Sequence, residues 1–236
     1  MSTITHIATV VPARNEATTI VACAESLRAA RRLLPPHVQA SIVVVADACD
    51  DRTAALARAA LDPDRDLVLE IHAGSAGAAR RTGTEVAIEQ AATRPDRMWL
   101  CSTDADSSVP KDWLAAHLDA AERGFVAVAG IVHLDDLAEA HVRREFSRTY
   151  LTHADGTHHH VHGANLGFRA DAYLAAGGWS PLATAEDHDL WNRLTGLGPT
   201  TSVTHLSVST SGRTVGRAPD GFAAALAALA TTDTAA

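Results

Sequence analysis

Apolar runs that alternate with helical segments over the first 106 residues constrain the fold more than any other feature of this 236-residue chain. The runs are short and rich in β-branched residues, which indicates buried strands, and the segments between them have helical periodicity. Strands joined by helices imply right-handed crossovers and a mostly parallel sheet with helices on both faces. We expect strands at 5–13, 41–48, 66–73 and 97–106, and helices at 17–34, 53–61 and 78–92.

In the second half of the chain the regular alternation of strands and helices ends, but no domain boundary is evident. It contains neither an internal repeat nor a linker rich in Gly or Pro. We therefore expect a single α/β domain over 1–220, with a Rossmann-like nucleotide-binding half at 1–106 and a half at 107–220 that could hold a second substrate. A helical and then frayed tail should follow at 221–236. The expected elements are helices at 109–123, 138–150 and 187–197, strands at 125–134 and 202–208, and a strand with a short helix within 163–179.

Composition narrows the class of protein. Hydrophobic residues make up 47% of the chain and charged residues 20%, as in an ordinary globular domain. The net charge of −8 argues against a nucleic-acid-binding surface, which needs a basic patch. Cys23, Cys49 and Cys101 are too few and too far apart for a disulfide framework or a zinc ribbon. With neither a signal peptide nor an apolar run of membrane-spanning length in view, we expect a soluble cytoplasmic enzyme without an integral membrane anchor.

An Asp-Ala-Asp triplet, Asp104 to Asp106, directly follows the fourth expected strand. In open α/β sheets ligands bind at the carboxyl ends of the strands, so the triplet lies where a ligand would bind. Two neighbouring carboxylates are costly unless positive charge neutralises them, and a hard divalent cation that carries a substrate's phosphates is a natural partner. The alternative is a strand-end turn in which both side chains hydrogen-bond to local backbone.

Four loops follow the four expected strands and should gather at one edge of the sheet. They are ARNEA at 13–17, ADACDD at 46–51, GSAGAARR at 74–81 and STDAD at 102–106. Taken singly, each has a plainer explanation: Asp47 beside a helix N-terminus, a glycine turn, or arginines on a solvated helix face. Taken together, they provide an acid for a base N–H, arginines for phosphates and a carboxylate pair, which predicts a nucleotide site.

The order and spacing of VVPARNEA, VVVADACDDRT, GSAGAARRTG and the Asp-Ala-Asp triplet form a recognisable pattern. Over roughly residues 5–215 the chain resembles the family-2 glycosyltransferases of GT-A fold, which transfer a sugar from a nucleotide-diphosphate donor. Ala46, Ala48 and Cys49 depart from the family pattern, so the identity of the nucleobase stays open. The resemblance implies these donor-site roles: Pro12, Ala13, Arg14 and Glu16 around the nucleoside, Asp47 on the nucleobase imide N–H, Gly77 in the Gly-rich segment, Arg80 at the basic position, Asp104 on the ribose or a metal-bound water, and Asp106 on the metal.

Two later segments extend the resemblance. HGANLGFRADAYLAAGGW is similar to the family's acceptor-side segment, and ATAEDHDLWNRL is similar to its Glu-Asp motif. The resemblance makes Asp187 the general base that takes the proton from the acceptor hydroxyl. An inverting transfer needs a carboxylate opposite the leaving diphosphate, whose growing charge the metal neutralises. The alternative is that Glu186, Asp187 and Asp189 are simply acids in the first turn of a helix, favoured by its dipole.

Histidines and a polar loop in the second half have open roles. His205, on the last expected strand, is a candidate metal ligand because some GT-A enzymes supply one from a C-terminal histidine; a solvent-facing strand histidine is the alternative. His158, His160 and His162 share one face of an extended segment. They could border an acceptor pocket and hydrogen-bond its hydroxyls, form an exposed polar turn, or bind zinc. The loop that contains Arg213 could close over the diphosphate or be a flexible surface loop.

The residues favour an inverting glycosyltransferase that uses a nucleotide-diphosphate sugar and Mn²⁺ or Mg²⁺. Since the chain shows no apolar anchor, a small soluble acceptor is favoured over a lipid carrier. A nucleotidyltransferase of related fold is one alternative, although that class usually opens with a Gly-rich loop and here the first loop is ARNEA. A non-catalytic protein that binds nucleotide sugars is the other.

Overall fold

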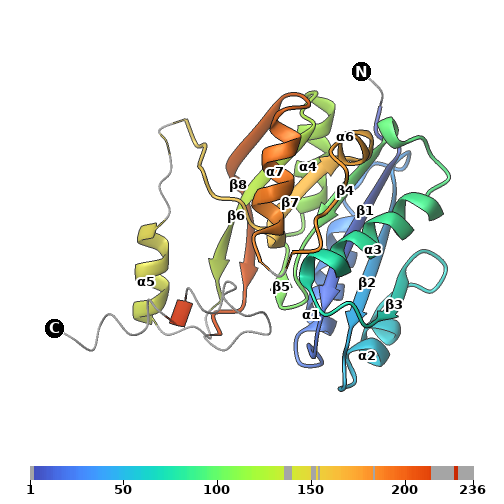
Figure 1. Cartoon of the computed structure of the whole chain (residues 1–236), viewed down its shortest axis with the longest axis vertical. Helices are drawn as coiled ribbons and strands as arrows, with labels where there is room; N and C mark the ends of the chain where they lie inside the picture. Colours follow the sequence, from blue (N-terminus) through green and yellow to red (C-terminus); the bar gives the residue numbers. More distant parts are fainter. Residues whose placement is uncertain are drawn as a thin grey trace.

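The computed structural model describes residues 3–135, 140–149, 153, 155–182, 184–213 and 226–227. Within them it shows an α/β fold with one eight-stranded sheet in the order β3-β2-β1-β4-β7-β6-β8-β5 (Figure 1). The strands are β1 His6–Ala13, β2 Gln39–Asp47, β3 Leu67–Ile71, β4 Met98–Ser102, β5 Ser107–Ser108, β6 Ala127–Leu134, β7 Leu166–Arg169 and β8 Thr200–Thr210. The helices are α1 Ile20–Arg31, α2 Thr53–Ala60, α3 Ala76–Gln90, α4 Trp113–Glu122, α5 Ala140–Thr149, α6 Ala170–Ala175 and α7 Glu186–Thr195, with short 3-10 turns η1 Pro95–Arg97 and η2 Gly163–Asn165.

The first four long strands form the predicted parallel layer. Strands β3, β2, β1 and β4 are all parallel neighbours, and β6 is parallel to β8. Strand β7 runs antiparallel between β4 and β6, and the short β5 pairs antiparallel with the end of β8. The sheet is therefore mostly parallel, as predicted. The antiparallel insertion was not predicted, because local periodicity does not show which strand a segment pairs with.

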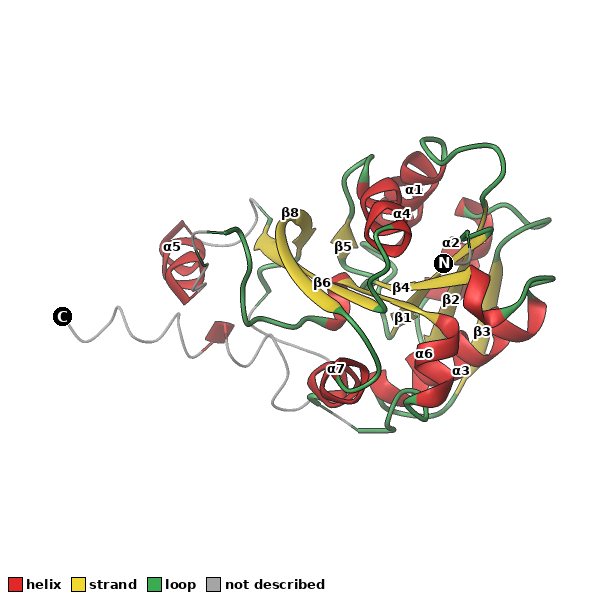
Figure 2. Ribbon diagram, turned by 90° about the horizontal axis from the view of Figure 1, so that it is seen from above, coloured by secondary structure: helices red, strands yellow, loops and turns green. Residues whose placement is uncertain are grey.

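Helices cover both faces of the sheet (Figure 2). Helices α1, α2 and α4 pack on one face and α3, α6 and α7 on the other. Successive residues of β1 point to opposite faces, so that Ile7 and Val11 join the first core cluster while Ala8 and Val10 join the second. Burial on both faces explains why this strand is a nearly continuous apolar run.

Helix α5 stands apart from the main body (Figure 1). Its Val142 and Phe146 pack with Val132 of β6 and with Leu226, forming a third and smaller core cluster. The predicted helix at 138–150 is confirmed over Ala140–Thr149, and its two ends lie outside the described residues. Of the predicted tail at 221–236, only residues 226 and 227 are described, both helical. Within the described part of the chain, none of the helices has the length and apolarity needed to cross a membrane.

Three predicted elements begin or end at other residues than expected. The predicted strand 97–106 ends at Ser102, because residues 103–106 turn and place Ser107 beside β8. The predicted helix 109–123 begins at Trp113, whose N–H bonds to the Pro110 carbonyl at 3.1 Å. The last strand is longer than predicted, from Thr200 to Thr210, and contains an irregularity opposite Gly130.

Candidate active site

Arg80 connects the carboxyl end of β4 to the start of α7. Its side chain lies in the second turn of α3 and the residue is only 4% exposed. The guanidinium donates from Nη2 to Asp104 Oδ1 at 2.5 Å and from Nε to Ser102 Oγ at 3.1 Å. Its Nη1 donates to Glu186 Oε1. One side chain therefore holds together residues 102, 104 and 186, which come from two distant parts of the chain.

The surroundings of Arg80 leave little space for another side chain. The guanidinium lies 5.5 Å from the centre of the Trp179 ring. A Cβ at Gly163 would lie 2.5 Å from Nη2 of Arg80, so a larger residue at position 163 would displace the guanidinium. Burial opposes the charge, but Asp104 and Glu186 outweigh it and raise the pKa of Arg80. Arg80 is thus not on a solvated helix face, whereas Arg81 is exposed and pairs with Glu85 at 2.9 Å.

A second arginine neutralises the other carboxylate of the triplet. Arg213 donates from Nη1 to Glu16 Oε2 at 2.8 Å and from Nη2 to Glu16 Oε1 at 2.6 Å. The same Nη2 lies 3.1 Å from Asp106 Oδ2. Burial and the neighbouring Asp104 raise the pKa of Asp106 to about 7, although Arg213 acts in the opposite direction. Three carboxylates therefore gather at this strand edge, and two guanidinium groups contact them.

Backbone-to-side-chain hydrogen bonds join the first loop to the second loop and to the start of α2. Glu16 N–H donates to Thr53 Oγ1 at 2.7 Å and Asp50 N–H donates to Asn15 Oδ1 at 2.9 Å. Asn15 and Ala48 have φ angles of 55° and 50°, in the left-handed region that residues other than Gly rarely adopt. Ala48, one of the positions that depart from the family pattern, thus adopts a left-handed conformation although it is not Gly. Glu16, in the first of these loops, bonds Arg213.

Asp47 ends β2 and is buried, at 4% exposure. Its Oδ1 accepts N–H bonds from Ala73 at 2.7 Å and from Gly74 at 3.0 Å. The side chain therefore anchors the loop after β3 and does not cap α2. Contact with a nucleobase stays a prediction. Near it, Pro12 and Ala13 end β1, and Arg14 is exposed.

Gly77 has a packing reason to be glycine. A Cβ there would lie 2.3 Å from the Ser180 carbonyl oxygen and 2.9 Å from that of Leu182. The first turn of α3 thus packs directly on the backbone that leads into α7. Gly77 lies three residues before Arg80 on α3, and its role towards a donor stays a prediction.

Asp187 lies in the first turn of α7, next to Glu186 and half-buried. Its Oδ2 accepts the Gly163 N–H at 2.8 Å and its Oδ1 accepts the His188 N–H at 2.8 Å. Each oxygen keeps a lone pair for a further partner. Asp189 instead bonds Ser180 Oγ at 2.6 Å and Arg193 Nη2 at 2.5 Å, a local structural role. The Glu186–Arg80–Asp104 chain ties the Asp187 region to the Asp-Ala-Asp triplet.

His205 is not brought to the carboxylates. It is exposed and lies in the irregular part of β8, between Val203 and Ser207. Thr210 of the same strand pairs with Ser107, directly after Asp106. Five residues of strand separate His205 from that pairing, or about 16 Å at about 3.3 Å per residue. A metal at Asp106 would therefore have to be held without this histidine.

The histidine run forms a row of rings. The His158, His160 and His162 rings follow one another at centroid distances of 6.1 and 6.2 Å, as the alternation along an extended segment predicts. In the described part of the chain no three His, Cys, Asp or Glu side chains are arranged to hold a metal ion. The structure thus gives no support to a zinc site in this run.

The carboxylates nevertheless fit a divalent cation that arrives with a diphosphate. Carboxylate oxygens are the ligands that Mg²⁺ and Mn²⁺ prefer, and such cations usually take only one or two carboxylates besides substrate phosphates. The raised pKa of Asp106 reflects burial and crowding of negative charge, which a cation would relieve. Asp106 is the residue that would hold it, with Asp104 beside it.

Sequence reasoning missed several partners in this site. Trp179 beneath Arg80 and Gly163 against it lie 99 and 83 residues further along the chain, and only the fold brings them together. The pairing of Arg213 with Glu16 spans 197 residues. The glycine-rich segment GANLG was the one local signal, since such segments allow close approach.

Solved structures share this fold at low sequence identity. TarS from S. aureus in complex with UDP superposes with a TM-score of 0.62 at 15% identity, covering 87% of this chain and 60% of TarS. The mannosyltransferase PcManGT from Pyrobaculum calidifontis, in complex with GDP-Man and Mn²⁺, superposes with a TM-score of 0.63 at 20% identity, covering 89% of this chain and 58% of PcManGT. This chain thus spans less than two thirds of either protein. A search of curated protein sequences found no significant match.

The family comparison is more specific. Residues 9–174 match the model of glycosyl transferase family 2. The match covers well over half of the chain and includes Asp47, Arg80, Asp104 and Asp106, while Asp187 lies beyond its end. The predicted resemblance and fold are therefore confirmed, and the chain belongs to glycosyl transferase family 2.

Proposed function

We propose that the protein is a metal-assisted, inverting glycosyltransferase that moves a hexosyl group from a nucleotide-diphosphate sugar to a hydroxyl of a small soluble acceptor. The observation that carries this proposal is the buried Arg80, which bonds both Asp104 and Glu186, the residue next to Asp187. Family membership supports transfer from a nucleotide sugar. The UDP and GDP-Man complexes of the neighbours support a nucleoside-diphosphate donor.

The donor would lie along the carboxyl ends of β1, β2 and β4. Pro12, Ala13, Arg14 and Glu16 would surround the nucleoside, and the free oxygen side of Asp47 would accept the base N–H. Asp104 would contact the ribose or a metal-bound water, and Asp106 would hold Mn²⁺ or Mg²⁺. The bound cation would neutralise the charge that develops on the leaving diphosphate. For this to happen Arg213 would have to exchange Asp106 for the phosphates, and its guanidinium suits both partners.

Asp187 would act as general base. Its carboxylate would take the proton of the acceptor hydroxyl as that oxygen bonds to the anomeric carbon and the bond to the diphosphate breaks. Attack opposite the leaving group inverts the anomeric configuration. The backbone N–H groups of Gly163 and His188 fix the carboxylate and leave lone pairs for the hydroxyl.

Asp187→Asn tests the assignment. The amide keeps an oxygen acceptor for one of the two N–H bonds, so the variant should fold and bind donor as the wild type does. Release of UDP or GDP from a panel of UDP- and GDP-sugars should fall by about a hundredfold or more, the usual contribution of a positioned base. Asp189→Asn, two residues along the same helix, is the matched control and should release nucleotide at nearly the wild-type rate. Unchanged release in Asp187→Asn would contradict the role of Asp187.

A further inference from the structure

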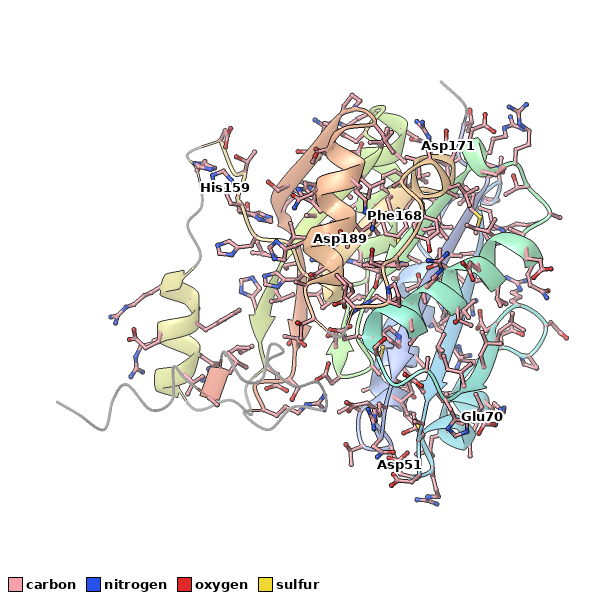
Figure 3. The ribbon with its side chains drawn as sticks, viewed as in Figure 1. Asp51, Glu70, His159, Phe168, Asp171 and Asp189 are labelled. Carbon is pink, nitrogen blue, oxygen red and sulfur yellow. The ribbon has the colours of Figure 1, made fainter. Side chains whose placement is uncertain are left out.

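A polar cavity of about 320 Å³ lies beside α7, between the histidine-rich segment and the start of β8. Its lining comes from the segment before β7, where Figure 3 labels His159, from Trp191 of helix α7 and from the start of β8. The size is within the range of small-ligand sites, which begins at about 300 Å³. None of the donor-site residues lines this cavity.

The cavity is lined mainly by polar side chains. Its lining consists of histidines, threonine and serine hydroxyls, Val161 and the indole of Trp191, and among the described residues it includes no Asp, Glu, Lys or Arg. Hydroxyl and neutral imidazole groups can each donate and accept a hydrogen bond. Phosphate and carboxylate groups are bound in proteins mainly through arginine, lysine or clustered backbone N–H groups. This wall therefore suits neutral hydroxyl groups better than anions.

Hydrogen bonds constrain which ring nitrogens of these imidazoles bear a proton. His158 Nδ1 accepts the His160 N–H at 3.2 Å, so its other ring nitrogen bears the proton. Burial lowers the pKa of His158 and favours that neutral form. His153 Nε2 and His159 Nε2 lie 2.9 Å apart, which requires that one of the two nitrogens be unprotonated.

The cavity is close to the proposed base. Trp191 follows Asp187 by four residues on α7, so both lie on one face of the helix, about 6 Å apart. The His160 ring in the wall stacks on the His162 ring at 6.2 Å and 2°. His162 in turn lies near enough to Asp187 for the carboxylate to act on its pKa. A ligand in the cavity could thus present a hydroxyl to Asp187.

We propose that this cavity binds the acceptor, and that the acceptor is an uncharged carbohydrate or glycoside whose sugar ring packs on Trp191. The identification of the ligand as the acceptor rests on the proposed function, whereas saccharide binding in the cavity does not. The indole would cover the apolar face of the sugar, and the imidazoles and hydroxyls would bond its hydroxyl groups.

Tryptophan fluorescence provides a direct test. Trp99, Trp113 and Trp179 are at most 1% exposed, whereas Trp191 is half-buried in the cavity wall. Titration with methyl glucosides, galactosides and mannosides and with cellobiose should give a saturable change of emission for at least one probe. The change should be absent in Trp191→Phe and retained in Asn192→Ala, an exposed neighbour on the same helix. Emission that responds only to glucose 6-phosphate or glucuronic acid, or to none of these probes, would overturn the proposal.

Two further measurements separate this site from the transferase function. The donor-induced thermal shift should be unchanged in Trp191→Phe. His160→Ala should raise the acceptor KM at least about tenfold without changing the donor KM. Saccharide binding without any donor binding would leave the cavity assignment intact and refute the transferase. Transfer to a saccharide with an unchanged KM in both cavity variants would refute the cavity assignment alone.

Discussion

The Arg80 guanidinium is held by Asp104, Glu186 and Ser102 and covered by Trp179. Five N–H donors in a fixed plane allow one arginine to bond several acceptors at once, which an ammonium group cannot match in geometry. Arg80 therefore contributes both to the stability of the fold and to the positions of Asp104 and the start of α7. If it moves, Asp104 and the start of α7 lose their common partner.

Arg80→Lys should reduce the free energy of unfolding by about 2 kcal/mol, because a buried Glu186 loses a well-placed partner although the charge is kept. It should also raise the donor KM. Urea unfolding measures the first effect and initial rates the second. Arg81→Lys, an exposed neighbour on α3, is the control and should change neither. Equal stability of the two variants would show that the Arg80 network does not support the fold.

His162 predicts a pH dependence of stability. Burial lowers its pKa to about 4, against the opposing field of Asp187, with His158, His160 and His188 also facing it. His162 therefore becomes protonated near pH 6.5 in the unfolded chain, but only near pH 4 in the folded protein. Stability should be complete above pH 6.5 and fall by about 3 kcal/mol as the pH drops towards 4.

His162→Gln isolates this contribution. The variant should lose less stability than the wild type between pH 7 and pH 5, measured by urea unfolding at each pH. His37→Gln, on an exposed turn, should follow the wild type. A variant and wild type with parallel pH profiles would contradict the assignment to His162.

At the residue scale, strand-end position was predictable and long-range pairing was not. Asp104 and Arg80 could be placed at the sheet edge because apolar runs mark strands and loops follow them. The partner of Asp47 could not, since its carboxylate bonds loop N–H groups whose direction depends on φ and ψ at residues 73 and 74. The salt bridge of Glu16 with Arg213 leaves no local pattern at either end.

At the scale of elements, α3 is the piece that joins the sheet to the site. It carries Arg80 and packs on β1 and β2 through Gly83. A Cβ at position 83 would lie 2.6 Å from Val10 Cγ1 and 2.7 Å from Val45 Cγ2, closer than real contacts allow. The glycine therefore sets the distance between helix and sheet. Because α3 carries Arg80, that distance also determines the position of the Arg80 guanidinium.

Gly83→Ala should destabilise the protein by about 1–3 kcal/mol, since overpacking outweighs the gain of up to about 1 kcal/mol in helix propensity. The shift should also raise the donor KM, because α3 carries Arg80. Gly196→Ala is the matched control, because a Cβ there would meet only the Arg193 carbonyl at 3.6 Å. The midpoint of urea unfolding is the measurement. A variant at position 83 as stable as the control would mean that helix and sheet are not held at this distance.

At the same scale, the alternating β and α elements of the first half followed from periodicity alone, with ends in error by a few residues. The order of the second half did not. Strand β7 enters between β4 and β6, and β5 joins β8 across about a hundred residues. Such pairings depend on which edges remain open once the first strands have formed, and single-sequence periodicity does not record that.

At the scale of the whole molecule, the sheet brings distant regions of the chain to one edge, where carboxylates outnumber the arginines that contact them. Asp104, Asp106 and Glu16 contact Arg80 and Arg213, and the cation of the proposed function would offset the excess negative charge. The three cysteines are free in the described structure. The family and the fold are established, and the donor site is the claim on which the proposed function depends.

Thermal unfolding with UDP- and GDP-sugars, with and without Mn²⁺, tests that claim most directly. A ligand at a hundred times its Kd stabilises the folded state by about 2.7 kcal/mol, which is a readily measured shift of Tm. The account predicts a shift that needs Mn²⁺, occurs with at least one donor, is retained in the surface control Asp119→Asn and is lost in Asp106→Asn. No shift with any donor, or an equal shift in Asp106→Asn, would contradict it.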